Sequence, residues 1–300
     1  MAKQKILVTG ANGQLGKELQ QLVVHYPQYD FVFRSKEELP IERVASVEAA
    51  FKTHRPNFCI NCAAYTAVDK AESEQELAFL INGIAPGILA KASKEYGCRF
   101  IHISTDYVFD GSASAPYTEN APVNPQSVYG ASKLQGEETT MRENPDAIII
   151  RTSWVYSAFG KNFVKTMAKL MGEKKEINVV NDQFGSPTYA ADLAQAILQI
   201  IGTLTTNDYR PAYRPGRLST SPIFHFSNHG IISWYEFAVA IKELTGSTCK
   251  INPIITAHYP TAAKRPAYSV LDKSKIQQTF GIQLKDWKES LAVCLEAMVV

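Results

Sequence analysis

The sequence predicts an α/β protein built on a doubly wound parallel sheet. Short apolar segments rich in β-branched residues alternate with helical patterns through residues 1–155, the order expected of successive β-α-β units. A glycine-rich turn stands where the first of these strands meets the first helix, a usual place for a ligand-binding turn in such sheets. The 300 residues are 45% hydrophobic and 20% charged, which is typical of globular proteins and excludes extensive disorder.

The predicted elements follow one another regularly up to Trp154. Strands are predicted at 5–9, 31–33, 58–61, 99–104 and 147–151. Helices are predicted at 13–24, 44–51, 72–96 and 127–143, with Pro86 expected to kink the third helix or to mark its boundary. Beyond Trp154 the alternation ends, and helical patterns are found at 161–172, 190–202, 233–245 and 286–298. Residues 203–222 have no periodic pattern and are interpreted as a surface insertion.

The charge and cysteine content argue against several classes of protein. The 31 Lys and Arg nearly balance the 29 Asp and Glu, so the chain has no general attraction to nucleic acid or to an anionic membrane. No apolar run approaches the roughly 20 residues of a membrane-spanning helix, and the first residues lack the apolar core of a signal peptide. The five cysteines are an odd number and do not suggest a disulfide framework. We therefore expect a soluble, cytoplasmic protein with reduced thiols.

The glycine-rich turn gives the first indication of a ligand. Gly10, Gly13 and Gly16 follow the first strand with the spacing G-x-x-G-x-x-G, and Gln14 and Leu15 lie between the last two. Glycines at such a junction allow a tight turn, let backbone N–H groups approach a pyrophosphate and let the helix pack closely on the strand. The positive end of the helix dipole then faces the anion. Because this is the first β-α junction of the chain, we predict that it binds a dinucleotide.

The tip of the second strand bears on the choice of dinucleotide. An acid there would bind the ribose hydroxyls of NAD, whereas a basic residue accommodates the 2′-phosphate of NADP. This strand ends in Phe33-Arg34-Ser35-Lys36, with no acid before Glu37. We predict NADPH as the cofactor, with Arg34 and Ser35 as its phosphate partners. Use of NADH, and a merely solvent-exposed role for Arg34, are left open.

Tyr129 and Lys133 form a Tyr-x-x-x-Lys pair on the helix that follows the fourth strand. Side chains at i and i+4 share one helix face, so a nearby ammonium is expected to favour the phenolate and to lower the pKa of Tyr129. Such a tyrosine can give its proton to a carbonyl oxygen while hydride arrives at the carbon. Ser104 and Thr105 end the fourth strand, and a hydroxyl there can hydrogen-bond the same substrate oxygen.

Several longer motifs give the chain a family resemblance. The segments at 9–16, 104–111 and 129–133 resemble the extended short-chain dehydrogenase/reductase superfamily. Those at 61–72, 151–156, 181–188 and 260–266 resemble the dTDP-4-dehydrorhamnose reductase family within it, so that the resemblance covers nearly the whole chain. It implies a Rossmann-like fold and an NAD(P)H-dependent reduction of the C4 ketone of dTDP-4-dehydro-6-deoxy-L-mannose, which yields dTDP-L-rhamnose. It also implies a place in the synthesis of cell-surface polysaccharides.

The same resemblance implies roles for individual residues. Tyr129 is the proton donor, and Lys133 orients it and binds the nicotinamide ribose. Thr105 tunes the tyrosine and, with Asp106, binds the sugar. Trp154 packs on the sugar nucleotide, and Arg265 contacts the substrate. Taken together, the predicted cofactor-binding residues are Gly10, Gly13, Gln14, Leu15, Gly16, Arg34, Ser35, Ala64, Tyr65, Thr66, Tyr129 and Lys133. Arg34 and Ser35 are predicted from the strand tip and depart from the family, which often has an acid there.

These expectations divide the chain into two parts. We predict an NADP(H)-binding domain at 1–155, to which the chain returns around 188–222, and a smaller α/β substrate-binding lobe from 156–187 and 223–300. A homodimer is compatible with the resemblance. Some family members use Mg²⁺ at a dimer contact, and Glu18 matches one such acid, but no matching partner set is found, so no metal site is assigned and the binding of Mg²⁺ is left open. Pro40 stands where the family commonly has an Asp before Ile41, so the family's adenine contact at this position is not carried over to this chain.

The sequence also bears on three other functions that this fold could carry. A 4,6-dehydratase of this superfamily carries Asp-Glu after the strand-end threonine, whereas Thr105 is followed by Asp106-Tyr107. A sugar-nucleotide epimerase, which keeps its cofactor bound, stays open. A non-catalytic NADP-binding regulator is disfavoured because it has no chemical need for both Tyr129 and Lys133. His102 is interpreted as a core or supporting residue.

Overall fold

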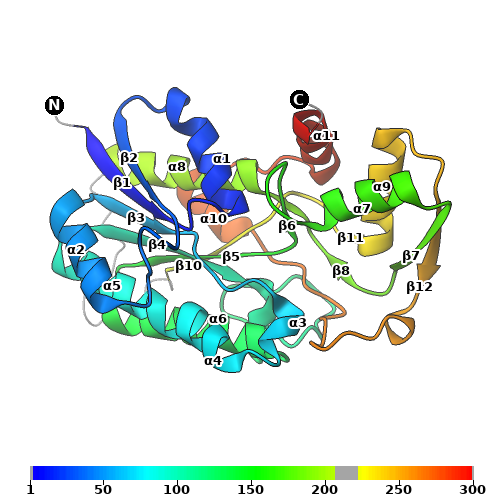
Figure 1. The fold of residues 1–300 in the computed structure, drawn as a ribbon, viewed down its shortest axis with the longest axis horizontal. Coiled ribbons are helices and arrows are strands. Elements are labelled where there is room, and N and C mark those ends of the chain that lie inside the picture. The colour runs from blue at the N-terminus through cyan, green and yellow to red at the C-terminus, as the bar shows by residue number, and fades with distance from the viewer. Residues whose placement is uncertain (1–2, 207–221, 299–300) are drawn as a thin grey trace.

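The computed structural model describes residues 3–206 and 222–298. Its largest feature is a six-stranded sheet with the strand order β10-β5-β4-β3-β1-β2 (Figure 1). These strands are β1 (Gln4–Thr9), β2 (Tyr29–Arg34), β3 (Phe58–Asn61), β4 (Arg99–Thr105), β5 (Ile148–Thr152) and β10 (Ile223–Phe226). Every pair in the sheet is parallel, which confirms the predicted doubly wound fold. The strand order reverses beside β1, and ligands of such sheets bind at the carboxyl ends of the strands near this point.

Helices cover both faces of the sheet (Figure 1). One face carries α1 (Gln14–Leu22), α8 (Ala190–Thr206) and α10 (Ser274–Phe280). The other carries α2 (Val44–His54), α5 (Ala85–Glu95) and α6 (Val128–Glu143). With both faces covered, the strands can be apolar along their whole length, as β5 with its run of isoleucines shows.

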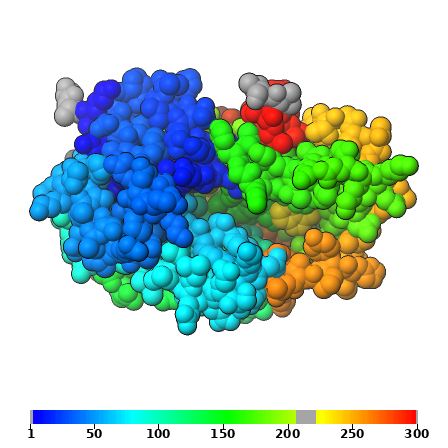
Figure 2. Space-filling model, in the orientation of Figure 1, coloured from blue at the N-terminus to red at the C-terminus, as the bar shows by residue number. Residues whose placement is uncertain are grey.

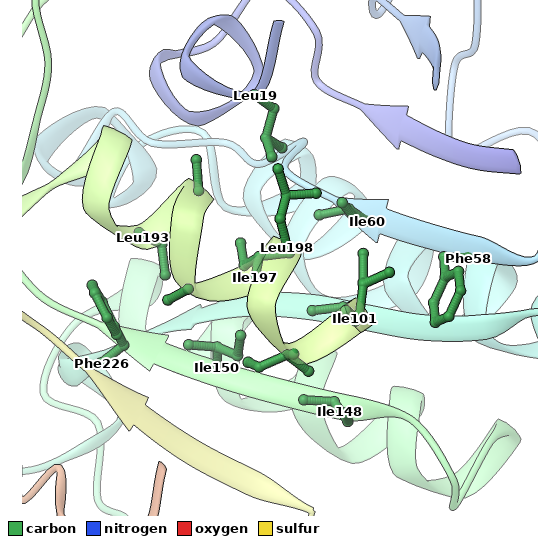
Figure 3. Packing of buried hydrophobic residues seen from close by; sticks show 14 of the residues in the cluster. Leu19, Phe58, Ile60, Ile101, Ile148, Ile150, Leu193, Ile197, Leu198 and Phe226 are labelled. Carbon is green, nitrogen blue, oxygen red and sulfur yellow. The ribbon is translucent and has the colours of Figure 1, made fainter. Parts of the chain in front are cut away.

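Helix α8 forms the centre of one of these layers. Its residues Leu193, Ile197 and Leu198 are at most 1% exposed and belong to one apolar cluster with the sheet residues Ile101 and Ile150 (Figure 3). Burying a side chain of this size stabilises a fold by roughly 1.5–3 kcal/mol. The packing of α8 therefore stabilises the large sheet, and the carboxyl edge of this sheet carries the site.

A smaller lobe has a core of its own. Its helices are α7 (Phe163–Glu173), α9 (Trp234–Thr245) and α11 (Trp287–Met298). Its strands pair as β6 (Val155–Tyr156) with β9 (Thr188–Tyr189), β8 (Phe184–Gly185) with β11 (Ile232–Ser233), and β7 (Glu176–Val180) with β12 (Lys250–Ile254). Phe237, Ile241 and Leu291 are buried in an apolar cluster separate from that of the large sheet.

The structure corrects one predicted helix. In place of a single helix over 72–96 it has α3 (Val68–Ala71), α4 (Gln75–Ala78), the π-helical segment η2 (Phe79–Ile84) and α5. Pro86 lies in the first turn of α5, where its missing N–H costs no helical hydrogen bond, so it begins a helix rather than kinking one. Helix α10 had no counterpart among the predicted elements.

The path of the chain between its two parts is more interleaved than predicted. Residues 223–226, assigned from the sequence to the lobe, form β10 at the edge of the large sheet. Ile276 and Phe280 of α10 also pack in the core of that sheet. Of the predicted insertion at 203–222, the first residues continue α8 as far as Thr206, and 207–221 lie outside the described residues.

Candidate active site

A cleft of about 750 Å³ opens at the carboxyl edge of the large sheet. Figure 2 shows the surface hollowed between the blue N-terminal part, the cyan segments and the green segment. The predicted site residues that line this cleft are Gly10, Gly13, Gln14, Leu15, Ala64, Tyr65, Thr66, Thr105, Asp106, Tyr129, Lys133 and Trp154. Gly16, Arg34, Ser35 and Arg265 lie outside this lining. Residues distant in the sequence thus converge on one cavity.

The glycine turn is as tight as the spacing predicts. Gly10 has a φ of +67°, and a Cβ there would lie 2.6 Å from the backbone nitrogen of Ala63. A Cβ at Gly16 would lie 2.5 Å from the carbonyl oxygen of Gly10, so this glycine lets α1 pack closely against the turn. Gly13 is the N-cap residue of α1 and its N–H donates to the Gly10 carbonyl at 2.9 Å, while Gln14 and Leu15 of the first helical turn line the cleft. Such an end suits a pyrophosphate.

The loop after β3 forms the next part of the wall. Asn82 of η2 clamps it by accepting a hydrogen bond from the Tyr65 N–H at 2.8 Å and donating one to the Tyr65 carbonyl at 3.0 Å. Ala64, Tyr65 and Thr66 are thereby held along the cleft. This clamp between residues 17 apart could not be read from the sequence.

The tip of β2 differs from the expectation for Arg34. Its guanidinium donates to the Phe33 carbonyl at 3.0 Å and lies 2.9 Å from Nε2 of His54. Ser35 is buried, and its N–H donates to Glu38. Lys36, which the sequence analysis did not select, lines the cleft and is exposed. The structure therefore offers a second cation at the place where a 2′-phosphate would be bound.

Helix α6 brings Tyr129 against the end of β4. Ser127 caps the helix by accepting the Gly130 N–H, and a Cβ at Gly130 would lie 2.3 Å from the carbonyl oxygen of Tyr107. This close approach places the rings of Tyr107 and Tyr129 edge to face, with centroids 5.4 Å apart. Lys133 is buried one turn further, and its Nζ donates to the Ile103 carbonyl at 2.6 Å.

The pKa of Tyr129 runs against the sequence prediction. Burial raises the pKa of Tyr129 to about 12, with hydrogen bonding to Thr105 acting in the opposite direction and the charge of Asp106 adding to the rise. Burial also lowers the pKa of Lys133 to about 8, against the charge of Glu137. The expected lowering of the Tyr129 pKa by Lys133 is thus wrong: burial dominates, and Lys133 is not among the groups that shift this pKa. A phenol that stays protonated is the form that a proton donor requires.

Thr105 and Asp106 form a linked pair beneath the tyrosine. The Thr105 hydroxyl donates to Asp106 Oδ1 at 2.9 Å, while the other carboxylate oxygen is buried and unpartnered among the described residues. Burial raises the pKa of Asp106 to about 6, although the Thr105 hydrogen bond acts against it. Ser104 takes no part in this pair, since its hydroxyl donates to Glu137 at 2.5 Å.

Trp154 forms the wall of the cleft on the side of the lobe. It has a φ of +49°, an uncommon conformation for a residue with a side chain, and stacks on Trp234 at a centroid distance of 3.5 Å. A Cβ at Gly185 would lie 2.6 Å from the Trp154 ring. Its position is therefore fixed from two sides.

Arg265 reaches the site through other residues. Its Nη2 donates to Asp69 at 2.6 Å, and its Nη1 is buried and unpartnered among the described residues. It also opposes the burial that raises the pKa of Tyr107, a residue of the cleft wall. It stands behind this wall rather than in it.

Two features of the site escaped the sequence analysis. Lys161 lines the cleft beside Gly160, where a Cβ would lie 3.1 Å from the Gln14 side chain. The neighbouring Asn162 donates to Gln14 at 2.9 Å and so ties the lobe to α1. Partners 148 residues apart leave no local signal in the sequence.

Metal ligands are a separate question. Within residues 3–206 and 222–298, no group of three or more His, Cys, Asp or Glu is placed to hold a metal ion. Glu18, the acid that matched the family's metal ligand, is buried and accepts a hydrogen bond from Ser157 at 2.6 Å.

The fold and the cleft together define a class of protein. A doubly wound sheet with a glycine turn after β1, and a Tyr-x-x-x-Lys helix after β4, is the arrangement of an extended short-chain dehydrogenase/reductase.

Comparison with known proteins narrows this class. A family model described as the RmlD substrate binding domain matches residues 4–300, so the chain belongs to this family. It is 42% identical to the spore coat polysaccharide biosynthesis protein SpsK of Bacillus subtilis, over 97% of each chain. It is 40% identical to the dTDP-4-dehydrorhamnose reductase of Aggregatibacter actinomycetemcomitans, over 96% of this chain and 97% of the other. The solved dTDP-4-dehydrorhamnose reductase of Bacillus anthracis, in complex with NADP, has a TM-score of 0.90 at 38% identity and covers 98% of this chain and 99% of its own.

Proposed function

We propose that this protein reduces the C4 ketone of dTDP-4-dehydro-6-deoxy-L-mannose to dTDP-L-rhamnose with NADPH. One observation carries the proposal: Tyr129, Lys133 and Thr105 converge on the cleft that the glycine turn closes on its other side. Full-length relatives named dTDP-4-dehydrorhamnose reductase support the choice of substrate.

The residues divide the work of the reduction. NADPH, when bound, supplies the hydride that adds to C4 of the sugar. Tyr129 gives its phenolic proton to the C4 oxygen, so that the C=O bond becomes CH–OH and NADP⁺ is released. When the Thr105 hydroxyl turns from Asp106 toward Tyr129, its hydrogen bond favours the phenolate and stabilises the anion until solvent returns the proton. Lys133 orients the tyrosine and binds the nicotinamide ribose.

The cofactor fits one side of the cleft. The N–H groups of Gln14 and Leu15 in the first turn of α1 suit the pyrophosphate, and Gly13 has no side chain to obstruct its approach. Arg34 and Ser35 remain the partners predicted for the 2′-phosphate, and Lys36 joins them because it lines the cleft. The NADP complex of the Bacillus anthracis relative supports this choice of cofactor.

The sugar nucleotide fits the other side. Thr105 and Asp106 present polar groups to the sugar, and the broad face of Trp154 provides a packing surface. Arg265 is held by its hydrogen bond to Asp69 and interacts with Tyr107, and we assign it a contact with the substrate on this side of the cleft.

Two other functions predict different behaviour. An epimerase would keep its cofactor bound and consume no NADPH. A regulator would bind NADPH without turnover, although it has no chemical need for a protonated Tyr129 beside Thr105. The dehydratase is disfavoured because Tyr107 occupies the position of its second acid.

Transfer of deuterium separates these functions. Protein is mixed with dTDP-4-dehydrorhamnose and NADPH deuterated at the transferable position of the nicotinamide. A reductase yields dTDP-L-rhamnose with one deuterium at C4, seen by mass spectrometry and NMR. Unlabelled product, or an epimer formed without loss of NADPH, would contradict the proposal.

The predictions of a homodimer and of a cytoplasmic location stand as part of this proposal. Among the residues described, no helix is long and apolar enough to cross a bilayer.

A further inference from the structure

A line of buried polar side chains runs beneath the cleft from the glycine turn to Lys133. Thr9, Asn61 and His102 lie on β1, β3 and β4, and their Cα positions are partners in the parallel register of these strands. Side chains at paired positions point to the same face of a sheet, so Thr9 contacts Asn61 and Asn61 contacts His102. Thr9, Asn61 and His102 are at most 1% exposed, and Lys133 is 2% exposed.

The hydrogen bonds of this line have a fixed direction. The Ala63 N–H, which can only donate, donates to Asn61 Oδ1 at 3.2 Å, and the Thr9 hydroxyl donates to the same oxygen at 2.6 Å. The carboxamide is therefore oriented with its NH₂ group toward His102. Its Nδ2 lies 3.1 Å from Nδ1 of His102, and since an NH₂ group donates, Nδ1 must accept.

This orientation determines the tautomer of His102. A neutral imidazole whose Nδ1 accepts carries its proton on Nε2. Burial, assisted by the charge of Lys133, lowers the pKa of His102 well below its ordinary range and keeps the ring neutral. The Nε2–H then faces Lys133 Nζ, 3.5 Å away.

A fixed donor facing Lys133 has a chemical consequence. The Nε2–H of His102 repels an ammonium group at Lys133 Nζ, whereas it can donate a hydrogen bond to the lone pair of a neutral amine there. The Ile103 carbonyl accepts from Nζ at 2.6 Å and anchors it on the other side. The carboxylate of Glu137, one turn along α6, favours the ammonium, but it is already paired with Arg151 of β5 at 2.6 Å.

We propose that His102 is a positioning residue for Lys133. The Nε2–H of His102, held in place by Asn61 and Thr9, opposes protonation of the Lys133 amine and fixes the position of this amine in the cleft. The line would then connect the base of the glycine turn with the reactive pair. Its bearing on catalysis rests on the proposed reductase function, whereas the direction of its hydrogen bonds does not.

The tautomer can be measured directly. In the full chain labelled with ¹⁵N-histidine, His102→Phe identifies the His102 signals by their loss, and His225→Phe identifies the buried ring that bonds the Tyr117 carbonyl. We expect His102 to be neutral from pH 6 to 9, with Nε2 protonated and Nδ1 bare. A proton on Nδ1, or an imidazolium in this range, would overturn the proposal.

The effect on Lys133 is measured by titrating ¹³C-labelled lysine, with the Lys133 signal assigned by its loss in Lys133→Met. We expect the midpoint of Lys133 to rise by at least about one pH unit in His102→Phe, a tenfold gain in proton affinity. Asn61→Asp, which keeps the shape but can only accept, should place the proton on Nδ1 and raise the midpoint too. His225→Phe, a matched loss of a buried ring, should leave it unchanged.

An unchanged Lys133 midpoint in both His102→Phe and Asn61→Asp would contradict the proposal. If His102→Phe fails to fold, Asn61→Asp alone decides the test. This variant is expected to fold because an Asp can still accept the hydrogen bonds from the Thr9 hydroxyl and the Ala63 N–H. These readouts need no substrate. A chain that shows the predicted tautomer and titration but leaves dTDP-4-dehydrorhamnose unreduced would refute the proposed function and support the positioning role.

Discussion

Burial sets the protonation of the two acids that meet in the cleft. Tyr129 has its pKa raised to about 12 and Asp106 to about 6, in both cases mainly by removal from water. Near neutral pH this gives a protonated phenol beside an ionised carboxylate. The side chain that can give a proton to a substrate oxygen is therefore the tyrosine.

Replacing Tyr129 by Phe removes that proton while retaining the ring. We expect turnover to fall by at least about a hundredfold, the lower range for loss of a positioned acid. Binding of NADPH, measured by fluorescence titration, should change by no more than about threefold. Turnover near that of the native chain would remove Tyr129 from its role.

Asp106→Asn tests the raised pKa through stability. An acid whose pKa rises on folding keeps its proton longer in the folded chain than in the unfolded one, so wild-type stability falls as pH rises from about 4 to about 6. The uncharged Asn avoids this loss. We expect the variant to be more stable by about 1–3 kcal/mol at pH 7.5, with the difference shrinking toward pH 4. Thermal unfolding across this range checks it, and a difference independent of pH would contradict it.

Cofactor preference tests the two cations near β2. Arg34→Asp should shift the preference from NADPH toward NADH if Arg34 binds the 2′-phosphate. Lys36→Asp should shift it further, because Lys36 lines the cleft whereas Arg34 contacts His54. We expect at least a tenfold loss of NADPH affinity in Lys36→Asp with little change for NADH. Equal losses for both cofactors would assign Lys36 to another part of the dinucleotide.

At the scale of elements, close backbone approaches at two glycines help to place Tyr129 and Trp154. Helix α6 reaches Tyr107 because position 130 is glycine, and Trp154 is held over the cleft because position 185 is glycine. A side chain at either position would have to displace backbone or a packed ring. The sequence shows these glycines but not what approaches them.

Gly185→Ala tests the placement of Trp154. The added Cβ would lie 2.6 Å from the indole, so the ring must shift. If the indole packs on the sugar nucleotide, KM for the sugar should rise about tenfold or more while NADPH affinity is retained. Gly172→Ala in α7 is the matched control: nothing lies within 4 Å of its Cβ, and the variant should be unchanged in KM and more stable by up to about 1 kcal/mol. An unchanged KM in Gly185→Ala would show that Trp154 does not contact the sugar.

At the scale of the molecule, the sequence was informative where chemistry is local. The sheet, the glycine turn and the Tyr129–Lys133 helix were predicted because each depends on short spacings and on alternating patterns. The direction of the Arg34 side chain and the lining residue Lys161 were not, since both depend on partners far along the chain. The pKa of Tyr129 was predicted in the wrong direction because burial cannot be read from a four-residue spacing. The entry of residues 223–226 into the large sheet was hidden for the same reason, as β10 pairs with a strand some 75 residues earlier.

The most direct test of the account is the loss of reduced-nicotinamide absorbance when the protein is mixed with NADPH and dTDP-4-dehydrorhamnose. We predict steady consumption that requires the sugar nucleotide and falls at least about a hundredfold in Tyr129→Phe. Absence of consumption, with NADPH still bound in a titration of the same sample, would contradict the reductase assignment and favour a dinucleotide-binding regulator or an enzyme for another sugar nucleotide.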